Sequence, residues 1–186
     1  EDYLKAIFGL SERGEPASTG AIAGALDVQP ASVTGMVKRM AESGLLEHAP
    51  YRGVRLTARG QREALRILRR HRVIETYLCE RLGFGWDDVH EEAERLEHAV
   101  SDLLVERMAA ALAFPRHDPH GAPIPTRDGD IEPTDAATLA DAPAGSFVRV
   151  RAVRDEDPTR LRAMEARGLT PGAHLRVETS EKSAEL

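Results

Sequence analysis

The sequence contains a single cysteine and no long apolar run, and both shortages exclude classes of protein. Cys79 has no second cysteine to pair with, so an internal disulfide is excluded, which suits a reducing cytoplasm. No apolar stretch is long enough to span a bilayer, and no signal-peptide pattern opens the chain. We therefore expect a cytoplasmic protein without membrane contact, whose 186 residues allow one sizeable core or two or three small domains.

The sequence also lacks the motifs of common enzymes. It contains no nucleophile elbow, no phosphate-binding glycine loop and no Ser/His/Asp set. His90 and Glu91 begin like the zinc-protease motif HExxH, but Glu94 stands where that motif needs its second histidine. We expect neither catalysis nor a small organic substrate.

Charge is distributed unevenly along the chain, although the net charge is −6. Residues 1–72 contain 12 Lys and Arg against 8 Asp and Glu, whereas residues 73–114 contain 3 against 10. A basic first segment joined to an acidic second one predicts one surface for a polyanion such as DNA and another for cations.

Residue types that bind metals are densest in the nonapeptide HEEAERLEH, which begins at His90. A helix turns by about 100° per residue, so His90, Glu94, Glu97 and His98 share one arc and the apolar residues lie opposite. One face could therefore hold a divalent cation while the other packs. Glu91 falls in the same arc, and acidic helix faces are commonly just solvated, so this pattern alone does not select its ligands.

The first part of the chain has the element order of a winged helix-turn-helix. Apolar spacing, caps and turn residues predict three helices followed by two short strands, over about 1–11, 18–26, 30–44, 45–48 and 54–57. The turn between the strands carries Arg52. The alternative is a small helical bundle with a surface hairpin, but element order, turn length and local charge favour the winged form.

Two further helices are expected after the wing. The first covers 58–82, and the second runs from Asp87, its predicted cap, to about Phe114. The apolar repeat of the second helix approximates a heptad, which suggests a helix–helix dimer contact. Packing within one chain is the alternative.

The last third of the chain predicts a connecting loop and a small β-domain. Residues 115–133 are rich in Pro, Gly, Asp and His, which is typical of a loop. Strands are expected over 146–153 and 174–179, with a helix between them that Asp157 caps and Pro158 begins. This order is typical of an SH3-like β-barrel.

Together these features resemble the diphtheria toxin repressor family, whose members are bacterial repressors activated by iron or manganese. The segments that carry the resemblance are EDYL at 1–4, HRVIE at 71–75, HEEAERLEH at 90–98, DPHG at 118–121 and RVRAVRDEDP at 149–158. The resemblance implies a mainly α chain with small β parts in three domains. These are a winged helix-turn-helix (1–63), a helical metal-binding and dimerisation domain with a linker at 115–132 (64–132), and an SH3-like, FeoA-like domain (133–186).

The resemblance implies a primary, DNA-activating metal site made of Asp2, Glu94, Glu97 and His98. Oxygen ligands with one imidazole suit Mn²⁺ and also accept Fe²⁺. Some manganese-responsive relatives have another acid at the position of Lys5, so we expect no two-metal cluster there. The alternative role for Asp2 is that of a helix cap.

The resemblance also implies an ancillary metal site. Its expected ligands are His71, Glu75, His90, Asp118, His120 and Asp155, whereas Asp157 is assigned to the helix cap. The alternative for His71 and Glu75 is an exposed pair four residues apart on one helix face.

For DNA, the resemblance assigns groove and phosphate contacts to the third helix and the wing. The expected residues are Gln29, Ala31, Ser32, Thr34, Gly35, Arg39 and Arg52. The two arginines would contact phosphates, which fix register rather than sequence. Gly35 stands where relatives have Gln, so recognition is expected to depend on DNA shape and van der Waals contact.

We therefore predict a Mn²⁺- or Fe²⁺-dependent homodimeric repressor that binds a double-stranded DNA operator and controls metal-uptake genes. The alternative is a metal-independent winged-helix regulator that senses another ligand.

Overall fold

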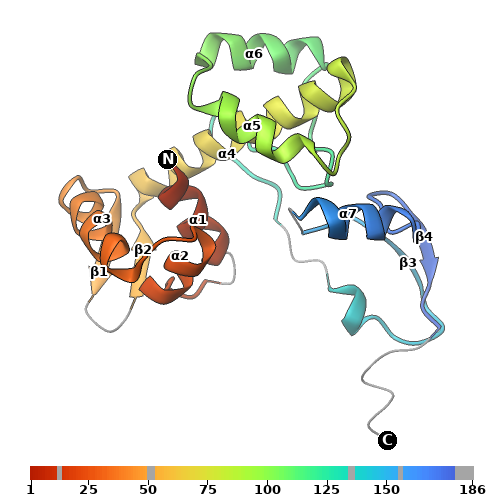
Figure 1. The fold of residues 1–186 in the computed structure, drawn as a ribbon, viewed down its shortest axis with the longest axis horizontal. Helices are drawn as coiled ribbons and strands as arrows, with labels where there is room; N and C mark the ends of the chain where they lie inside the picture. Colours follow the sequence, from red (N-terminus) through yellow and green to blue (C-terminus); the bar gives the residue numbers. More distant parts are fainter. Residues whose placement is uncertain (12–13, 50–52, 134–136, 155–156, 179–186) are drawn as a thin grey trace, which may run out of the picture. The chain divides into compact units, whose positions relative to one another are not determined.

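The computed structural model describes residues 1–11, 14–49, 53–133, 137–154 and 157–178. These residues are mainly helical with two small sheets, which confirms the predicted fold class (Figure 1). The chain forms two compact units. Unit 1 comprises residues 1–69 and 125–130, and unit 2 comprises residues 70–124 and 131–186.

Unit 1 contains the predicted winged helix-turn-helix. Its elements are α1 (Asp2–Leu10), α2 (Thr19–Ala25), α3 (Pro30–Glu42), β1 (Leu46–Ala49), β2 (Gly53–Leu56) and the first half of α4 (Ala58–Leu82). The two strands pair antiparallel, with Leu46 opposite Leu56. Both strands lie one residue from their predicted positions, and α4 has its predicted bounds.

Local chemistry explains where the helices of unit 1 begin and end. The Ser18 hydroxyl accepts a hydrogen bond from the backbone N–H of Ala21 and caps α2, as predicted. Pro30 occupies the first turn of α3, where a missing N–H has no cost. Gly44 follows α3 with a φ of +74°, a conformation that glycine adopts without strain.

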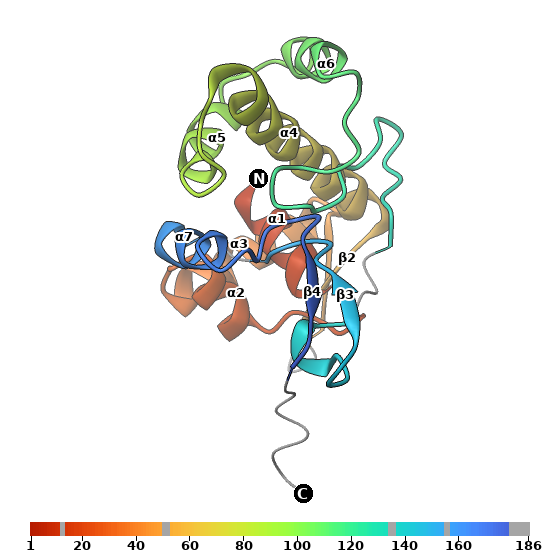
Figure 2. The same ribbon diagram turned by 90° about the vertical axis from the view of Figure 1, so that its right-hand side faces the viewer.

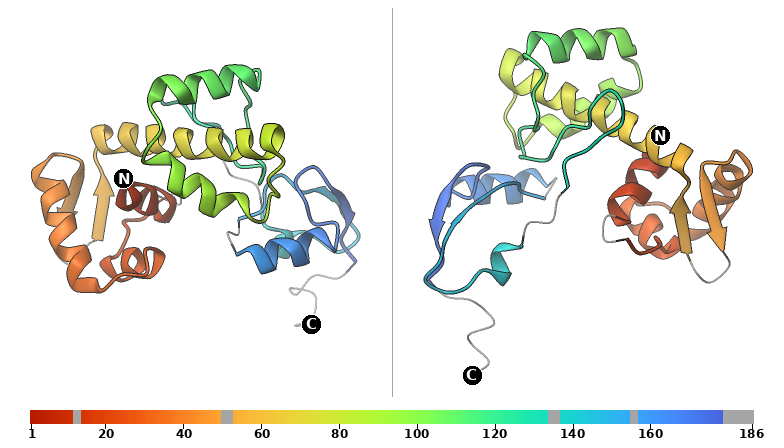
Figure 3. Two further views of the ribbon diagram at one scale, coloured as in Figure 1. Left: turned by 45° about the horizontal axis from the view of Figure 1, so that its top comes forward. Right: turned by 180° about the vertical axis from the view of Figure 1, so that it is seen from behind.

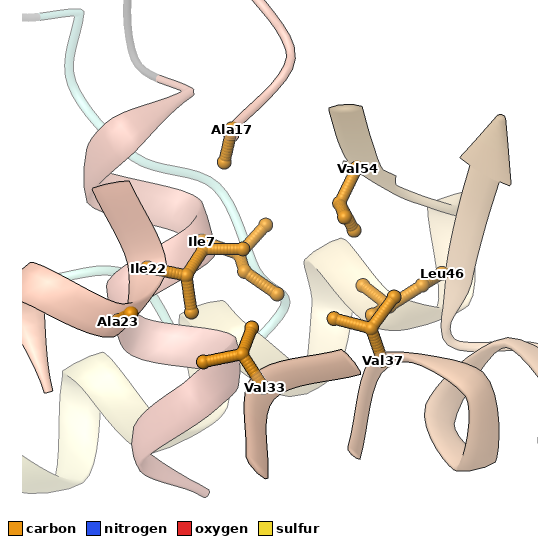
Figure 4. Close-up of a cluster of buried hydrophobic side chains, with 8 residues drawn as sticks. All are labelled: Ile7, Ala17, Ile22, Ala23, Val33, Val37, Leu46 and Val54. Atoms are coloured by element: carbon orange, nitrogen blue, oxygen red, sulfur yellow. The ribbon is translucent and has the colours of Figure 1, made fainter. Parts of the chain in front are cut away.

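The core of unit 1 holds α3 against the other helices and the wing. Figure 4 shows one cluster of this core, whose eight buried side chains are Ile7, Ala17, Ile22, Ala23, Val33, Val37, Leu46 and Val54. Full burial of each larger aliphatic side chain contributes about 1.5–3 kcal/mol. Because Val33 and Val37 fill this core, the opposite face of α3 stays exposed.

Unit 2 begins with the second half of α4, beside which lie α5 (Val89–Glu97) and α6 (Asp102–Ala111) (Figure 3). Ile74 and Leu78 of α4 pack against Val89 and Ala93 of α5. A neighbouring cluster joins α4 to α6 and to the following loop, and it contains Val73, Val105, Ala109 and Ile124.

The predicted single helix from Asp87 to Phe114 is wrong, because two helices occupy this segment. Ser101 starts the second one by accepting a hydrogen bond from the N–H of Leu104. The first helix is preceded by Asp88, whose side chain makes no cap bond, while Asp87 instead pairs with Arg162 at 2.8 Å.

The continuous heptad seam predicted for that segment is therefore also wrong. Its first residues, Val89 and Ala93, are buried against α4 of the same chain, whereas Leu103 is 69% exposed. For α5 the alternative expectation is correct, because this helix packs against α4 of the same chain.

The C-terminal part of unit 2 contains η1 (Leu139–Asp141), β3 (Phe147–Arg149), α7 (Pro158–Glu165) and β4 (His174–Arg176). The two strands lie side by side and pair antiparallel, with Val148 opposite Leu175 (Figure 2). Both are shorter than predicted. Asp157 caps α7 by accepting hydrogen bonds from the N–H groups of Thr159 and Arg160, as predicted.

No helix of the described residues has the length and apolarity needed to cross a membrane.

Candidate metal centres

A buried group of three potential metal ligands lies between α4 and α5. His71 and Glu75 are four residues apart on α4, and His90 lies on α5. Glu75 Oε1 is 2.9 Å from His71 Nε2 and 3.1 Å from His90 Nδ1, and the two nitrogens are 3.2 Å apart. Ligands at right angles around a cation, each about 2.1 Å from it, would be about 3 Å apart. The donors and their spacing therefore fit a divalent cation.

The charge of Glu75 is maintained inside this group although the residue is buried. Burial raises the pKa of Glu75, but hydrogen bonds with His71 and His90 lower it by more, so its pKa lies well below the ordinary 4.5. The predicted alternative, an exposed His71–Glu75 pair, is wrong because both side chains are buried.

A second group lies at the C-terminal end of α5. Glu94 and Glu97 belong to α5, His98 is its C-cap, and their ligand atoms lie within 4.8 Å of one another. Glu97 is fully buried, Glu94 is half-buried and His98 is exposed. Glu97 Oε1 is 3.8 Å from His98 Nε2, and the other oxygen, Oε2, is 2.7 Å from His71 Nδ1. A buried carboxylate between two imidazoles thus joins this group to the first one.

Glu75 also belongs to a third buried group, with Asp118 and His120 from the loop after α6. Asp118 Oδ1 accepts hydrogen bonds from the N–H groups of His120 and Ala122, and Oδ2 is 3.3 Å from Nε of Arg72. Burial and the charge of Glu75 raise the pKa of Asp118, against the lowering effect of Arg72. The loop is therefore folded around the buried carboxylate of Asp118. A nearby cation would favour the ionised form of this group.

His120 is oriented by a backbone carbonyl. Its Nε2 lies 2.7 Å from the carbonyl oxygen of Trp86, which can only accept, so Nε2 carries the proton. In the neutral imidazole Nδ1 then has the free lone pair that a cation needs. The carbonyl of His120 accepts from the N–H of Val153, which ties this loop to the C-terminal part of unit 2.

The remaining predicted metal ligands are Asp2 and Asp155. Asp2 is exposed and is the first residue of α1, in unit 1. Glu1 occupies the N-cap position of that helix. Asp155 lies outside the described residues. No local spacing predicted the contact between His71 and Glu97, which are 26 residues apart and meet because α5 packs on α4.

The predicted DNA-contacting residues of α3 share one exposed face. Gln29 is the N-cap, and Ala31, Ser32, Thr34, Gly35 and Arg39 are all exposed on the helix. The Thr34 hydroxyl donates to the carbonyl of Pro30, and a Cβ added at Gly35 would meet open space. Arg52 lies outside the described residues.

Comparisons with known proteins agree with this arrangement. Residues 1–54 match the family described as iron dependent repressor, N-terminal DNA binding domain, and residues 57–126 match its metal binding and dimerisation domain. Residues 137–184 match the FeoA domain. The chain is 33% identical to the iron-dependent repressor IdeR of Mycobacterium leprae (strain TN) over 97% of its own length and 84% of that protein. The chain belongs to the iron-dependent repressor family.

Other relatives of this iron-dependent repressor family member support the same assignment. It is 34% identical to the diphtheria toxin repressor of Corynebacterium efficiens (strain DSM 44549 / YS-314 / AJ 12310 / JCM 11189 / NBRC 100395), over 83% of this chain and 69% of that protein. A solved structure of a manganese-dependent transcriptional repressor in complex with manganese superposes with a TM-score of 0.88 at 40% identity, over 98% of this chain and 85% of the other. The predicted resemblance to the diphtheria toxin repressor family is confirmed, and the family consists of DNA-binding repressors rather than enzymes.

Proposed function

We propose that this chain is a Mn²⁺- or Fe²⁺-dependent repressor that binds a double-stranded operator as a homodimer and controls genes of metal uptake. The observation that carries the proposal is the donor chemistry of unit 2. Its three groups offer only carboxylate oxygens and imidazole nitrogens. Such donors suit Mn²⁺ and Fe²⁺ better than softer metals. Cys79 does not change this chemistry, because burial raises the pKa of its thiol to about 12.

We assign Asp2, Glu94, Glu97 and His98 to the metal site that activates DNA binding. Asp2 belongs to the helix-turn-helix unit and the other three to unit 2, so a shared cation would link the two units. Without the cation, the carboxylates of such a site repel one another. Metal binding would then favour the arrangement of the units that can bind DNA, which is a population shift.

We assign the ancillary site to the residues around Glu75, namely His71, His90, Asp118 and His120, of which His90 is half-buried and the others are buried. The orientation of His120 by the Trp86 carbonyl supports this role, because ligating histidines commonly donate their other N–H to such a group. Asp155 is a further candidate ligand.

We assign operator contact to the exposed face of α3 and to the wing. Small side chains at Ala31, Ser32 and Gly35 would let the helix backbone approach a groove closely. Arg39 and Arg52 would bind phosphates. The two copies of α3 in a dimer would enter successive major grooves, roughly 34–36 Å apart.

Metal removal tests the function directly. DNA ligands would be selected from a random double-stranded library with Mn²⁺ present, and the affinity for the selected DNA measured by fluorescence anisotropy with Mn²⁺, with anaerobic Fe²⁺ and with chelator. We expect the chelator to weaken binding by roughly 5–150-fold, the usual range of coupling between two sites. Equal affinity in chelator and in metal would refute metal dependence and favour a regulator of the metal-independent type.

A matched pair of variants on α5 tests whether the proposed activating site causes the metal response of DNA binding. Glu97→Gln removes a buried charge of the proposed activating site with little change of shape, so we expect the metal response of DNA binding to be lost. Glu91→Gln is the control, because Glu91 is exposed on the same helix and pairs with Arg95 at 3.3 Å. A Glu97→Gln chain that responds to Mn²⁺ like the control would contradict the assigned site.

A further inference from the structure

His120 is held from two directions by segments outside its own loop. Its ring nitrogen Nε2 lies 2.7 Å from the carbonyl oxygen of Trp86, in the turn between α4 and α5. Its own carbonyl accepts a hydrogen bond of 2.9 Å from the backbone N–H of Val153, in the C-terminal part of unit 2. The first contact orients the ring and the second holds the backbone. The position of Nδ1, the nitrogen with the available lone pair, therefore depends on both segments.

The turn that supplies the Trp86 carbonyl is tied to the C-terminal part by an ion pair. Asp87 Oδ2 lies 2.8 Å from Nη1 of Arg162, which belongs to α7. The Trp86 carbonyl and the Asp87 nitrogen form one peptide unit, which is planar and moves as a body. A shift of Asp87 therefore turns the oxygen that His120 contacts. Arg162 is thus connected to the ring of His120 although it does not contact it.

The turn leaves room for the Asp87 carboxylate. A Cβ added at Gly85 would lie 2.5 Å from Asp87 Oδ1 and 3.2 Å from Asp88 Oδ1. The indole N–H of Trp86 is buried and has no hydrogen-bond partner among the described residues, although the ring lies 5.7 Å from that of His120 between centroids. The Trp86 side chain therefore gives the turn no polar contact, whereas Asp87 gives it the contact with Arg162.

The loop of His120 also packs closely against the C-terminal part. Gly121 has a φ of +84°, and a Cβ added there would overlap the carbonyl oxygen of Arg151. Asp118 Oδ1 accepts hydrogen bonds of 2.9 Å from the N–H groups of His120 and Ala122, which makes the loop a compact element. A displacement of His120 would therefore also be felt by Asp118, the second potential ligand in this loop.

We propose that Arg162 is a positioning residue for the Glu75–Asp118–His120 group, acting through Asp87 and the Trp86 carbonyl on the ring of His120. With the ion pair in place, the carbonyl keeps the proton on Nε2 and leaves the Nδ1 lone pair for a cation. Without the pair, the carbonyl loses its fixed position and the ring its preferred proton position. The proposal rests on the proposed ancillary site and gives α7 an influence on metal affinity without making it a ligand.

Three substitutions in the full chain test this role. Arg162→Gln removes the cation, Arg162→Lys retains one, and Asp87→Asn removes the carboxylate. The control is Arg167→Gln, because Arg167 is exposed in the same part of the chain and donates to the carbonyl of Ala163. The proton position of His120 is measured by ¹⁵N NMR of the histidine-labelled, metal-free chain, with a His120→Gln chain to assign the signal. Mn²⁺ affinity is measured by calorimetry.

The wild-type chain and Arg167→Gln are expected to carry the His120 proton on Nε2. Arg162→Gln is expected to shift part of the population to a proton on Nδ1 and to weaken Mn²⁺ binding at the ancillary site by up to about 5-fold, the effect of losing one exposed ion pair. Arg162→Lys should retain most of the wild-type behaviour. Adding Asp87→Asn to Arg162→Gln should cause no further loss, because both changes break the same pair.

Two results would overturn the positioning role and leave metal dependence intact. One is an Arg162→Gln chain that matches Arg167→Gln in both measurements. The other is a changed proton position with unchanged Mn²⁺ affinity. A wild-type chain that binds no Mn²⁺ would overturn the proposed function and the role of Arg162 in metal affinity together.

Discussion

At the scale of single residues, Glu75 connects two candidate metal groups. Oε1 contacts His71 and His90 in one group, and the residue also lies with Asp118 and His120 in the other. Burial alone would raise the pKa of this carboxyl group, yet the hydrogen bonds outweigh it and hold the pKa below its ordinary value. The folded protein is therefore stabilised by keeping Glu75 ionised, and this stabilisation depends on pH.

Replacing Glu75 by Gln should lower the free energy of unfolding at pH 7 by about 1–3 kcal/mol, because buried charge-assisted hydrogen bonds are lost. A folded-state pKa below the unfolded value of 4.5 gives stability that is complete above about pH 4.5 and is lost as the pH falls toward the folded pKa. The stability difference between wild type and Glu75→Gln should therefore shrink as the pH falls below about 4.5. Urea unfolding in chelator from pH 7 to 3 measures it.

The control for this prediction is Glu80→Gln, which changes an exposed acid on the same helix. It should alter stability little at any pH. A gap between wild type and Glu75→Gln that stayed unchanged down to pH 3 would contradict the pKa assigned to Glu75.

Local spacing predicted some of the residue contacts and could not predict others. His71 and Glu75 share a helix face because they are four residues apart, and the structure places their polar atoms 2.9 Å apart. The contact of His71 with Glu97 depends on how two helices pack, which local spacing does not encode. The ligand roles of all these residues, including Asp2, stay predictions that metal titration can test.

At the scale of elements, the predicted order of helices and strands is largely confirmed, and the exception has a physical cause. Leu96, Val100 and Leu103 continue a helical apolar spacing across the break between α5 and α6, and neither Gly nor Pro interrupts it. The only local signal is Ser101, whose hydroxyl caps the second helix. A serine is too common inside helices to predict a break, so packing of both helices on α4 decides it.

Replacing Gly60 by Ala tests how closely α4 packs against the wing. Ala is the better helix former by about 1 kcal/mol, so helix propensity alone predicts stabilisation. A Cβ at Gly60 would, however, overlap the carbonyl oxygen of Leu45, which is backbone and cannot move aside easily. We expect Gly60→Ala to destabilise unit 1 by about 1–3 kcal/mol, as overpacking does, measured by urea unfolding.

Gly35→Ala is the matched control for that substitution. Gly35 is also helical, and a Cβ added there would meet no atom within 4 Å. This variant should stabilise the chain by up to about 1 kcal/mol. Stabilisation of both variants to the same extent would show that the carbonyl of Leu45 leaves room for a methyl group.

At the scale of the whole molecule, unit 2 exposes several large apolar side chains. Leu82 is 60% exposed, Leu103 69% and Phe114 63%, and Leu104 is exposed as well. Arg81 at the end of α4 donates to the carbonyl of Ala111 at the end of α6, which keeps these helix ends together. Exposed apolar surface commonly marks protein–protein contacts. Because residues 57–126 match a dimerisation domain, we expect this surface to contact a second copy of the chain.

Leu103→Glu should weaken the dimer by roughly 10-fold or more, since a charge would replace the most exposed leucine of this surface. DNA affinity should fall with it, because two half-sites are bound better by a dimer. Sedimentation equilibrium over a range of protein concentrations measures the dissociation constant. Leu139→Glu is the control, because Leu139 is 49% exposed but belongs to the C-terminal part of unit 2. If Leu103→Glu dimerises as tightly as this control, the dimer contact lies on another surface and does not include the exposed leucines of α6.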